Sequence, residues 1–455
     1  MFNKLTFKAG AAQVDITPPQ GTFVGVDFFN HYARFIHDPL YAKALVVGND
    51  GLLVALVIVD ICIMPSDLMS DIKSRIRKQT GINPENIMLS CTHTHGAGNV
   101  AGLLCGSVDI AYRTKIPDLV VKAVDLAIRK MKPAKVASGS TEVPEHVLCR
   151  RYLMKKEYSP LNPVTGEVDL IKTNPIGVEH LIERPAEPVD PGVGFLAIKG
   201  MDESWIALLG NYCLHYVGDW HVDSITADYY GEFSRMIHQK LDTDKEFVGM
   251  MSYGTGGDVN IWDFMDPDRY PREYYAKTRL IAGDLSDKVV EAIKTVQWDE
   301  NPALGILYEE LELTVRKPSQ EELKVARKRL LENDFDELEI NHEGMLMVYA
   351  REQILLEEYP PASAASVQAI KIGDLIIGAL GGEFFSETGI NLKGSVPAKN
   401  YFTVCLANTY DGYVPPAHEF DRGGYETWRA RSSFLERDAE RKISNKLLEL
   451  IRKMI

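Results

Sequence analysis

Two neighbouring apolar runs, Leu40 to Val47 and Leu52 to Val59, constrain the fold of this chain more than any other feature. They are joined by Gly48-Asn49-Asp50-Gly51, in which Asp-Gly supplies the positive φ of a tight turn, so the pattern predicts a β-hairpin. Further along, short apolar runs alternate with stretches of helical periodicity, which is typical of an α/β protein. We therefore expect a mixed β-sheet core flanked by helices.

The same periodicities predict the other main elements. Helices are expected over 65–79, 117–131, 229–241, 273–296, 319–333, 345–358 and 436–454, and strands over 86–90, 193–198, 205–212, 247–251, 366–372 and 375–380. The stretch 149–192 is rich in Pro, Asn, Lys and Glu and lacks periodicity, which predicts an irregular excursion over the surface. We expect a single domain over residues 1–455, with this excursion and a small helical subdomain at 316–360.

Composition excludes several classes of protein. The net charge of −14 argues against a nucleic-acid partner, since phosphate binding needs clustered Lys and Arg. The longest apolar run, Leu52 to Ile63, is interrupted by Asp60 and is shorter than the ~20 residues that cross a bilayer. The N-terminus lacks the apolar stretch of a secretory signal, which predicts a cytoplasmic protein acting on a small molecule. The six cysteines form no CxxC pair, so a thiolate metal site is not indicated.

The chemistry begins with His93 and His95, which follow the expected strand at 86–90 and alternate with threonine. If this segment is extended, both imidazoles point to the same face. Zinc favours neutral imidazole nitrogens and carboxylate oxygens, so such a pair suits a shared metal. A His-x-His pair alone is more often structural.

Two further residues stand at similar places. His215 follows the expected strand at 205–212, and Glu383 follows the strand at 375–380 and a pair of glycines. Active-site residues often occupy the loops at strand ends. Taken singly, however, His215 would be structural and Glu383 a helix cap or an exposed carboxylate.

Taken together and in order, these segments resemble the neutral or alkaline non-lysosomal ceramidases. The segment Ala9 to Pro18 is similar to the family's AGxGxxDITP start, and Ser90 to His95 is similar to its SHTHSGP motif. Gly382-Glu383-Phe384 is similar to its GEF segment. Tyr413 and Tyr425 are twelve residues apart, as are two active-site tyrosines of the family.

The resemblance implies a zinc enzyme and assigns its residues. The implied zinc ligands are His93, His215, Glu383 and Tyr413. His95 corresponds to a histidine that assists catalysis, and Tyr425 to the second active-site tyrosine. Arg150 corresponds to the family's active-site arginine, with Arg151 as the alternative.

The chain departs from the family pattern at Gly256-Gly257-Asp258-Val259-Asn260, where Asn260 replaces the serine of the GDVSPN motif. That serine has a central catalytic role in ceramidases, so a bond other than that of ceramide is expected to be cleaved. Gly96-Ala97-Gly98 also replaces Ser-Gly-Pro. The chain stops at Ile455, which leaves no room for the family's C-terminal immunoglobulin-like domain. We expect a smaller, soluble substrate.

The resulting hypothesis is a zinc-dependent hydrolase that cleaves an amide or ester bond by metal-activated water. His95 would shuttle protons, while Tyr425, Arg150 and the amide of Asn260 would stabilise the oxyanion. Asp258 and Asp228 either orient the histidines or cap helices. His221 is either a substrate contact or an ordinary loop residue.

Two alternatives stay open. One is a zinc-dependent lyase or other carbohydrate-active enzyme, for example one that eliminates from a uronate-containing sugar. That chemistry needs no serine and fits Asn260 better. The other is a non-catalytic binding protein, which is disfavoured because the ligand-type residues are all present.

Overall fold

The computed structural model describes residues 6–25, 31–49, 51–104, 106–333 and 341–455. An eight-stranded sheet has the order β16-β14-β13-β8-β1-β5-β6-β7. Its strands are β1 (Lys8–Asp15), β5 (Tyr41–Asn49), β6 (Leu52–Val59), β7 (Ile87–Cys91), β8 (Lys132–Glu142), β13 (Gly192–Gly200), β14 (Trp205–Tyr212) and β16 (Val248–Tyr253). β5 and β6 pair antiparallel, as the hairpin prediction requires, although the turn residue Asp50 lies outside the described residues.

A second sheet of four strands has the order β18-β19-β20-β22. It consists of β18 (Leu304–Thr314), β19 (Ala362–Ile372), β20 (Leu375–Leu380) and β22 (Asn400–Val404). The predicted strand at 366–372 starts earlier, at Ala362. β18 is absent from the sequence-based expectation because its Glu309, Glu310 and Glu312 obscure the apolar alternation of an edge strand.

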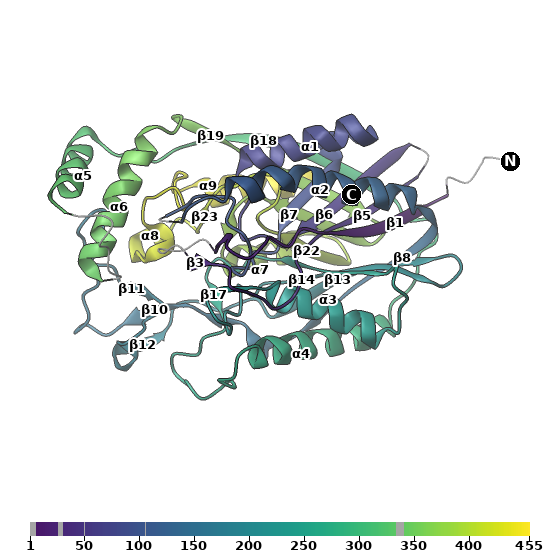
Figure 1. Cartoon of the computed structure of the whole chain (residues 1–455), viewed down its shortest axis with the longest axis horizontal. Coiled ribbons are helices and arrows are strands. Elements are labelled where there is room, and N and C mark those ends of the chain that lie inside the picture. The colour runs from purple at the N-terminus through teal and green to yellow at the C-terminus, as the bar shows by residue number, and fades with distance from the viewer. Residues whose placement is uncertain (1–5, 26–30, 50, 105, 334–340) are drawn as a thin grey trace.

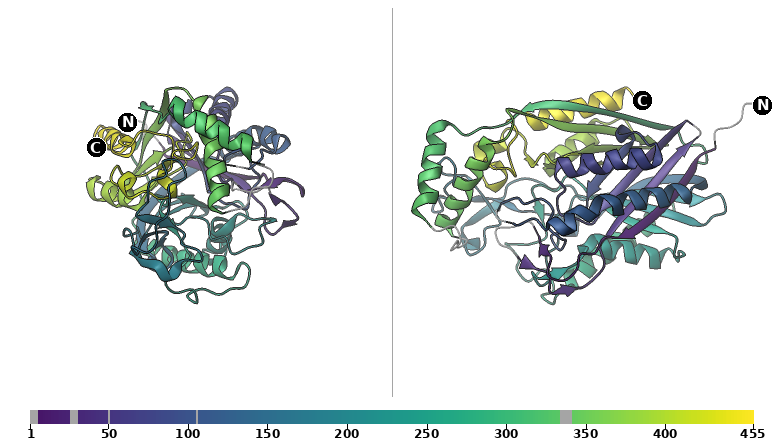
Figure 2. Two further views of the ribbon diagram at one scale, coloured as in Figure 1. Left: turned by 90° about the vertical axis from the view of Figure 1, so that its left-hand side faces the viewer. Right: turned by 45° about the horizontal axis from the view of Figure 1, so that its top comes forward.

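Helices cover the outer faces of the two sheets and also lie at one end of the molecule (Figures 1 and 2). They are α1 (Ser66–Thr80), α2 (Ile110–Arg129), α3 (Asp228–Lys240), α4 (Ala276–Ile293), α5 (Gln320–Glu332), α6 (His342–Glu357), α7 (Ser386–Ser395), α8 (Glu419–Arg422) and α9 (Ala439–Arg452). α1 and α2 pack on the β1–β7 half of the large sheet, and α3 and α4 pack on the β8–β16 half. α9 packs on β18 and β19 of the small sheet. The expected mixed sheet core flanked by helices is confirmed.

The alternation along β6 explains why its sequence is apolar throughout. Ala55, Val57 and Val59 pack in the core under the helices, whereas Val54, Leu56 and Ile58 pack in a second core that also contains Ile370 and Ile377 of the small sheet. A strand buried on both faces reads as a continuous apolar run. The two sheets therefore pack face to face beneath the outer helices.

α2 begins earlier than predicted. The sequence indicated a start at Pro117, but the helix starts at Ile110, and the Asp109 side chain caps it by accepting a hydrogen bond from the Tyr112 N–H at 2.9 Å. Pro117 lies inside the helix. A side-chain cap thus decides the start here, and the proline was a misleading marker.

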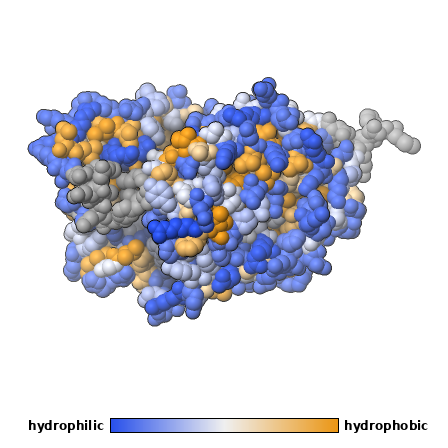
Figure 3. Space-filling model, viewed as in Figure 1, coloured by the Kyte–Doolittle hydropathy of each residue, from blue (hydrophilic) through white to orange (hydrophobic). Residues whose placement is uncertain are grey.

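The stretch 149–192 is less irregular than predicted. It contains a three-stranded sheet of β10 (Arg151–Met154), β11 (Ile171–Thr173) and β12 (Ile182–Pro185), in the order β11-β10-β12. With α5 and α6, it lies at one end of the molecule, on the left in Figure 1. Apolar side chains gather on the surface near α5 and α6 (Figure 3), where Val325 and Leu331 are exposed. The division into domains stays a prediction.

Short elements connect these parts and place several site residues. They are β2 (Phe23–Val24), β3 (His31–Tyr32), β4 (Phe35–Ile36), β9 (Leu148–Cys149), β15 (Ser224–Ile225), β17 (Val259–Asn260), β21 (Glu383–Phe384), β23 (Tyr413–Val414) and the 3₁₀ turn η5 (Tyr425–Thr427). Among the described residues, no helix has the length and apolar character needed to cross a membrane. The described cysteines are free and buried, and Cys105 lies outside the described residues.

Gly10 provides a test of how closely α2 packs on β1. A Cβ at this position would clash with the backbone carbonyl of Ala127 and lie 2.7 Å from the Met131 backbone nitrogen. We expect Gly10→Ala to lower the free energy of unfolding by about 1–3 kcal/mol, because backbone atoms cannot move aside easily. Gly394→Ala in α7 is the control, since its Cβ would meet no atom within 4 Å. Urea unfolding of both variants measures the difference, and equal stability would contradict this packing argument.

Candidate metal centre

Three predicted ligands meet at the ends of strands. His93 follows β7, His215 follows β14, and Glu383 begins β21. One donor atom from each lies within 4.8 Å of the others, and all three residues are buried. The two Nε2 atoms of the histidines are 3.1 Å apart, and His93 Nε2 lies 3.3 Å from Glu383 Oε2.

The curl of the large sheet brings the two histidines together. β1 and β8 pair over only two residues, so the sheet divides there into two halves. The edge strands β7 and β16 then come into contact, although they stand at opposite ends of the strand order. β14 pairs with β16, so His215 beyond the end of β14 lies beside His93.

Backbone groups and one tyrosine fix which nitrogen of each imidazole faces the centre. His93 Nδ1 lies 2.9 Å from the Cys62 carbonyl oxygen, which can only accept, so the proton of the neutral ring is on Nδ1. His215 Nδ1 lies 3.1 Å from the Tyr253 hydroxyl and 3.4 Å from the Gly256 carbonyl. Both rings are thereby oriented with Nε2 toward the shared centre, as in histidines that bind metals.

The backbone of His93 is not extended, which corrects one expectation. Its φ is 74°, in the left-handed region, so the rule that alternate residues share a face does not apply here. The rings of His93 and His95 lie 5.0 Å apart at 89° to each other and do not point in parallel. A left-handed non-glycine residue costs roughly 1–2 kcal/mol, which is typical of a functional position.

The donor set fits a metal ion. Ligand atoms of a tetrahedral zinc site are roughly 3.3 Å apart, given metal–nitrogen distances near 2.0–2.1 Å, and the observed separations are 3.1 and 3.3 Å. Glu383 Oε2 is buried without a hydrogen-bond partner among the described residues. Burial lowers the pKa of His93, but Cys62 and Glu383 outweigh burial and hold the pKa well above its usual value. His215 differs, because burial and the nearby charges of His93 and Arg150 hold its pKa well below its usual value.

Tyr413 stands directly beside Glu383, because β21 and β23 pair in parallel with these two residues opposite each other. Burial raises the pKa of Tyr413 well above its usual range, although the Arg150 guanidinium over its ring opposes this. The Tyr425 ring lies 5.6 Å from the Tyr413 ring. The structure thus places both predicted tyrosines near the centre.

His95 lies on the more exposed side of the centre. Its ring stacks on Tyr216 at 3.7 Å, and its Nε2 has no hydrogen-bond partner in the described part of the chain. Burial, followed by the nearby charges of His93 and Arg150, holds the pKa of His95 well below its usual value. His95 is therefore held in its neutral form.

The two neighbouring arginines have different surroundings. Arg150 Nε donates to Glu426 at 2.8 Å, and its Nη1 lies 3.4 Å from His215 Nε2. Arg151 also donates to Glu426, but its other partners are Glu419 at 2.6 Å and the Gly423 carbonyl at 2.9 Å. Arg150 is therefore the arginine beside the metal donors.

Asn260 pairs through its backbone with Leu148, which lies two residues before Arg150 in the chain. Its side-chain Nδ2 donates to Asn174 Oδ1, and its Oδ1 accepts from the Trp262 N–H at 2.9 Å. The amide is thus engaged with neighbouring loops. Its predicted part in oxyanion stabilisation stays a prediction.

Asp258 and Asp228 accept hydrogen bonds near helix starts. Asp258 Oδ1 binds the N–H of Ser386, the first residue of α7, at 2.7 Å. Asp228 begins α3 and accepts from the Val217 N–H at 2.7 Å. The described structure shows neither bound to an imidazole, and neither is an N-cap residue, because Ala227 and Phe385 hold the N-cap positions of α3 and α7. His221 is a half-exposed loop residue 3.9 Å from Asp223.

Sequence reasoning missed three residues around the centre. Tyr253 and the Cys62 carbonyl orient the histidines, and Glu426 holds Arg150. Tyr253 is the last residue of β16, and the predicted ligands also lie at strand ends. Its place in the sequence could therefore have indicated a site residue. Glu426 directly follows Tyr425 in the chain, but nothing in its neighbours indicates two arginine partners.

Other donor groups suit a metal less well. Glu187, His418 and Glu419 cluster near the surface, but Arg422 binds both carboxylates and Arg151 also binds Glu419. Cys62 Sγ lies 3.7 Å from His93 Nδ1, on the side of the ring that faces away from His215.

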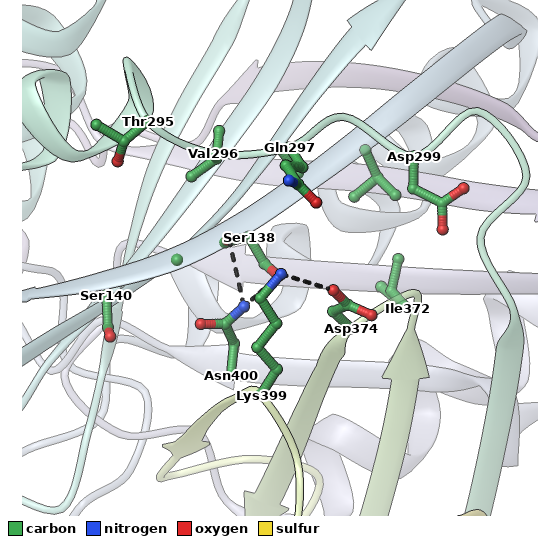
Figure 4. Close-up of a pocket in the computed structure, with 13 residues that line it drawn as sticks. Ser138, Ser140, Thr295, Val296, Gln297, Asp299, Ile372, Asp374, Lys399 and Asn400 are labelled. Atoms are coloured by element: carbon green, nitrogen blue, oxygen red, sulfur yellow. Dashed lines mark hydrogen bonds and ion pairs between the residues drawn. The ribbon is translucent and has the colours of Figure 1, made fainter.

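A cavity of about 340 Å³ lies away from this centre (Figure 4). Four of its polar lining residues pair with one another: Asn400 Nδ2 donates to Ser138 Oγ at 3.0 Å, and Lys399 binds Asp374 at 3.1 Å. None of the predicted site residues line it. The cavity therefore adds nothing to the candidate chemistry.

Comparison with known proteins agrees with the motifs. Residues 7–154 match the family model described as neutral/alkaline non-lysosomal ceramidase, N-terminal. Two curated neutral ceramidases, from Drosophila pseudoobscura pseudoobscura and Drosophila melanogaster, are each 34% identical over 97 residues. That alignment covers 20% of this chain and 14% of each relative.

Solved structures extend the likeness to the whole fold. The neutral ceramidase from Pseudomonas aeruginosa superposes with a TM-score of 0.74 at 17% identity, over 99% of this chain and 75% of that one. A ceramidase complexed with C2 gives 0.73 at 16% identity, over 99% and 76%. The expected resemblance to neutral ceramidases is confirmed, and at this identity the structures show the fold.

Proposed function

We propose that this chain, which has the fold of the neutral ceramidases, is a zinc-dependent hydrolase that cleaves an amide or ester bond in a small substrate. One observation carries the proposal: His93 Nε2, His215 Nε2 and Glu383 Oε2 converge within 4.8 Å in a buried centre. Two histidines and one glutamate form a ligand set that catalytic zinc sites use.

Different residues would have different roles in such a reaction. His93, His215 and Glu383 would hold the zinc, with Tyr413 beside Glu383 as a further ligand. When bound there, zinc would act as a Lewis acid and would lower the pKa of water toward neutrality. His95, with its neutral imidazole, would take up and return a proton. Arg150 and Tyr425 would donate hydrogen bonds to the oxygen that gains negative charge.

A second candidate is a zinc-dependent lyase, which the identity of residue 260 favours. Asn260 stands where the family has serine, and its amide, held by Asn174 and Trp262, offers no nucleophile. Elimination needs none, and Arg150 could neutralise a carboxylate. Attack by water equally needs no side-chain nucleophile, so the two candidates share the same centre.

The mass of the products separates hydrolysis from elimination. We expect a panel of N-acyl and ester compounds to include one whose products together exceed it by about 18 mass units, because hydrolysis adds water. Products whose masses sum to that of the substrate would establish the lyase and contradict hydrolysis.

Tyr425→Phe tests the role of the second tyrosine. Loss of a hydrogen-bond donor to a developing oxyanion costs about 10²–10³ in kcat, and zinc binding should not change because Tyr425 is not among the proposed ligands. Tyr349→Phe is the control, since it removes a tyrosine hydroxyl that is buried without a partner among the described residues. Both variants are assayed for kcat and zinc content on the substrate found above. Equal kcat in the two variants would remove Tyr425 from the mechanism.

A further inference from the structure

Glu426 joins three chain segments through one buried carboxylate. Its Oε1 accepts from Arg150 Nε at 2.8 Å, and its Oε2 accepts from Arg151 Nη1 at 2.5 Å and from Thr173 Oγ1 at 2.8 Å. Glu426 has no exposed surface. We infer that Glu426 is a positioning residue for the metal centre, which it serves by holding the guanidinium of Arg150; this inference rests on the proposed zinc site.

The contacts of Arg150 show how Glu426 affects the metal centre. Arg150 follows β9 and reaches toward His215, so its guanidinium has Glu426 on one side and a metal donor on the other. The same guanidinium lies over the Tyr413 ring, with Cζ 5.2 Å from the ring centroid. Glu426 also belongs to η5, whose first residue is Tyr425. The Glu426 carboxylate therefore holds Arg150 in place and also fixes the turn that contains Tyr425.

Charge gives Glu426 a second effect on the centre. Arg150 Nη1 lies 3.4 Å from His215 Nε2, so a full positive charge stands beside the proposed cation site. Arginine does not lose its proton in proteins, and it repels a metal ion at short range in a buried site. Glu426 offsets that charge from the far side. Without it, zinc binding should weaken.

Glu419 provides a matched comparison within the same network. It is as buried as Glu426 and binds Arg151 at 2.6 Å. In the described part of the chain, however, its carboxylate pairs with Arg151, Arg422 and His418 and not with Arg150. A purely structural role predicts the same consequences for both glutamates. A positioning role predicts that only Glu426 affects the metal.

The test compares Glu426→Gln with Glu419→Gln in the full-length protein. Zinc affinity is measured by chelator competition, the ligand geometry by the visible spectrum of the Co²⁺-loaded protein, and stability by thermal unfolding without metal. We expect both variants to lose stability. Only Glu426→Gln should weaken zinc binding, by about tenfold for one uncompensated nearby charge, and alter the cobalt spectrum. Arg150→Gln combined with Glu426→Gln should recover most of the zinc affinity.

Several results would decide against the inference. Equal zinc affinities and equal cobalt spectra for Glu426→Gln and Glu419→Gln would overturn it while leaving the zinc site intact. Wild-type protein that binds no zinc would overturn the proposed function itself. If Glu426→Gln does not fold, Thr173→Val removes one hydrogen bond to the same carboxylate without exposing a buried charge. It should weaken zinc binding in the same direction, and unchanged affinity would count against the inference.

Discussion

Replacing Glu383 by glutamine is expected to reduce both zinc affinity and kcat/KM by more than about 100-fold, because loss of an outer partner of a metal ligand alone costs roughly 10–100-fold. Glu383 is the anionic member of the ligand set, and its Oε2 is buried without a hydrogen-bond partner among the described residues. Glutamine keeps the shape but removes the charge. Zinc titration and steady-state kinetics of the variant measure the two losses.

Glu387→Gln is the control for this variant. Glu387 lies four residues further on, in α7, where it pairs with His418 near the surface at 3.3 Å. Both substitutions remove one negative charge from the same part of the chain, so a difference between them reports the metal centre. Wild-type zinc affinity in Glu383→Gln would mean that this carboxylate is not a ligand.

Replacing Asp60 by alanine is expected to lower the free energy of unfolding by about 3–5 kcal/mol, the cost of leaving one partner of a buried ion pair alone. Lys43 Nζ lies 3.2 Å from Asp60 Oδ2, and both side chains are almost completely buried. Within the described ranges, the other polar partner of Lys43 is Ser234 at 3.3 Å, which cannot balance its charge. Chemical denaturation of the variant gives the loss directly.

The double variant Lys43→Met/Asp60→Leu distinguishes the cost of an unpaired buried charge from the cost of changing the side chains at these positions. Replacing both partners of a buried pair by apolar residues is often neutral or stabilising, so this protein should regain most of the stability lost in Asp60→Ala. A loss below about 1 kcal/mol in the single variant would show that Lys43 reaches water and would contradict its burial.

The sequence predicted the interior elements better than the edge elements. β6 reads as a strand because both of its faces are buried, whereas β18 at a sheet edge exposes glutamates that hide its alternation. The start of α2 was misplaced, since a proline and the Asp109 cap compete as signals and only the cap forms a hydrogen bond. Propensity cannot decide between such signals without tertiary context.

The sequence predicted which residues form the site, but it did not predict how they are arranged in space. His93, His215 and Glu383 were identified by their places after strands and by the family motifs. The approach of the two histidines depends on the division of the large sheet between β1 and β8, which no local pattern encodes. Glu426 was missed for the same reason, because its partners Arg150 and Arg151 lie about 275 residues away in the chain.

Metal analysis of the purified protein tests the central claim most directly. Elemental analysis by mass spectrometry after loading with zinc and removal of excess metal should give one zinc per chain for the wild type. The variants His93→Ala and Glu383→Ala should retain almost none, since each removes one of three converging donors. Stoichiometric zinc in both variants, or none in the wild type, would contradict the account.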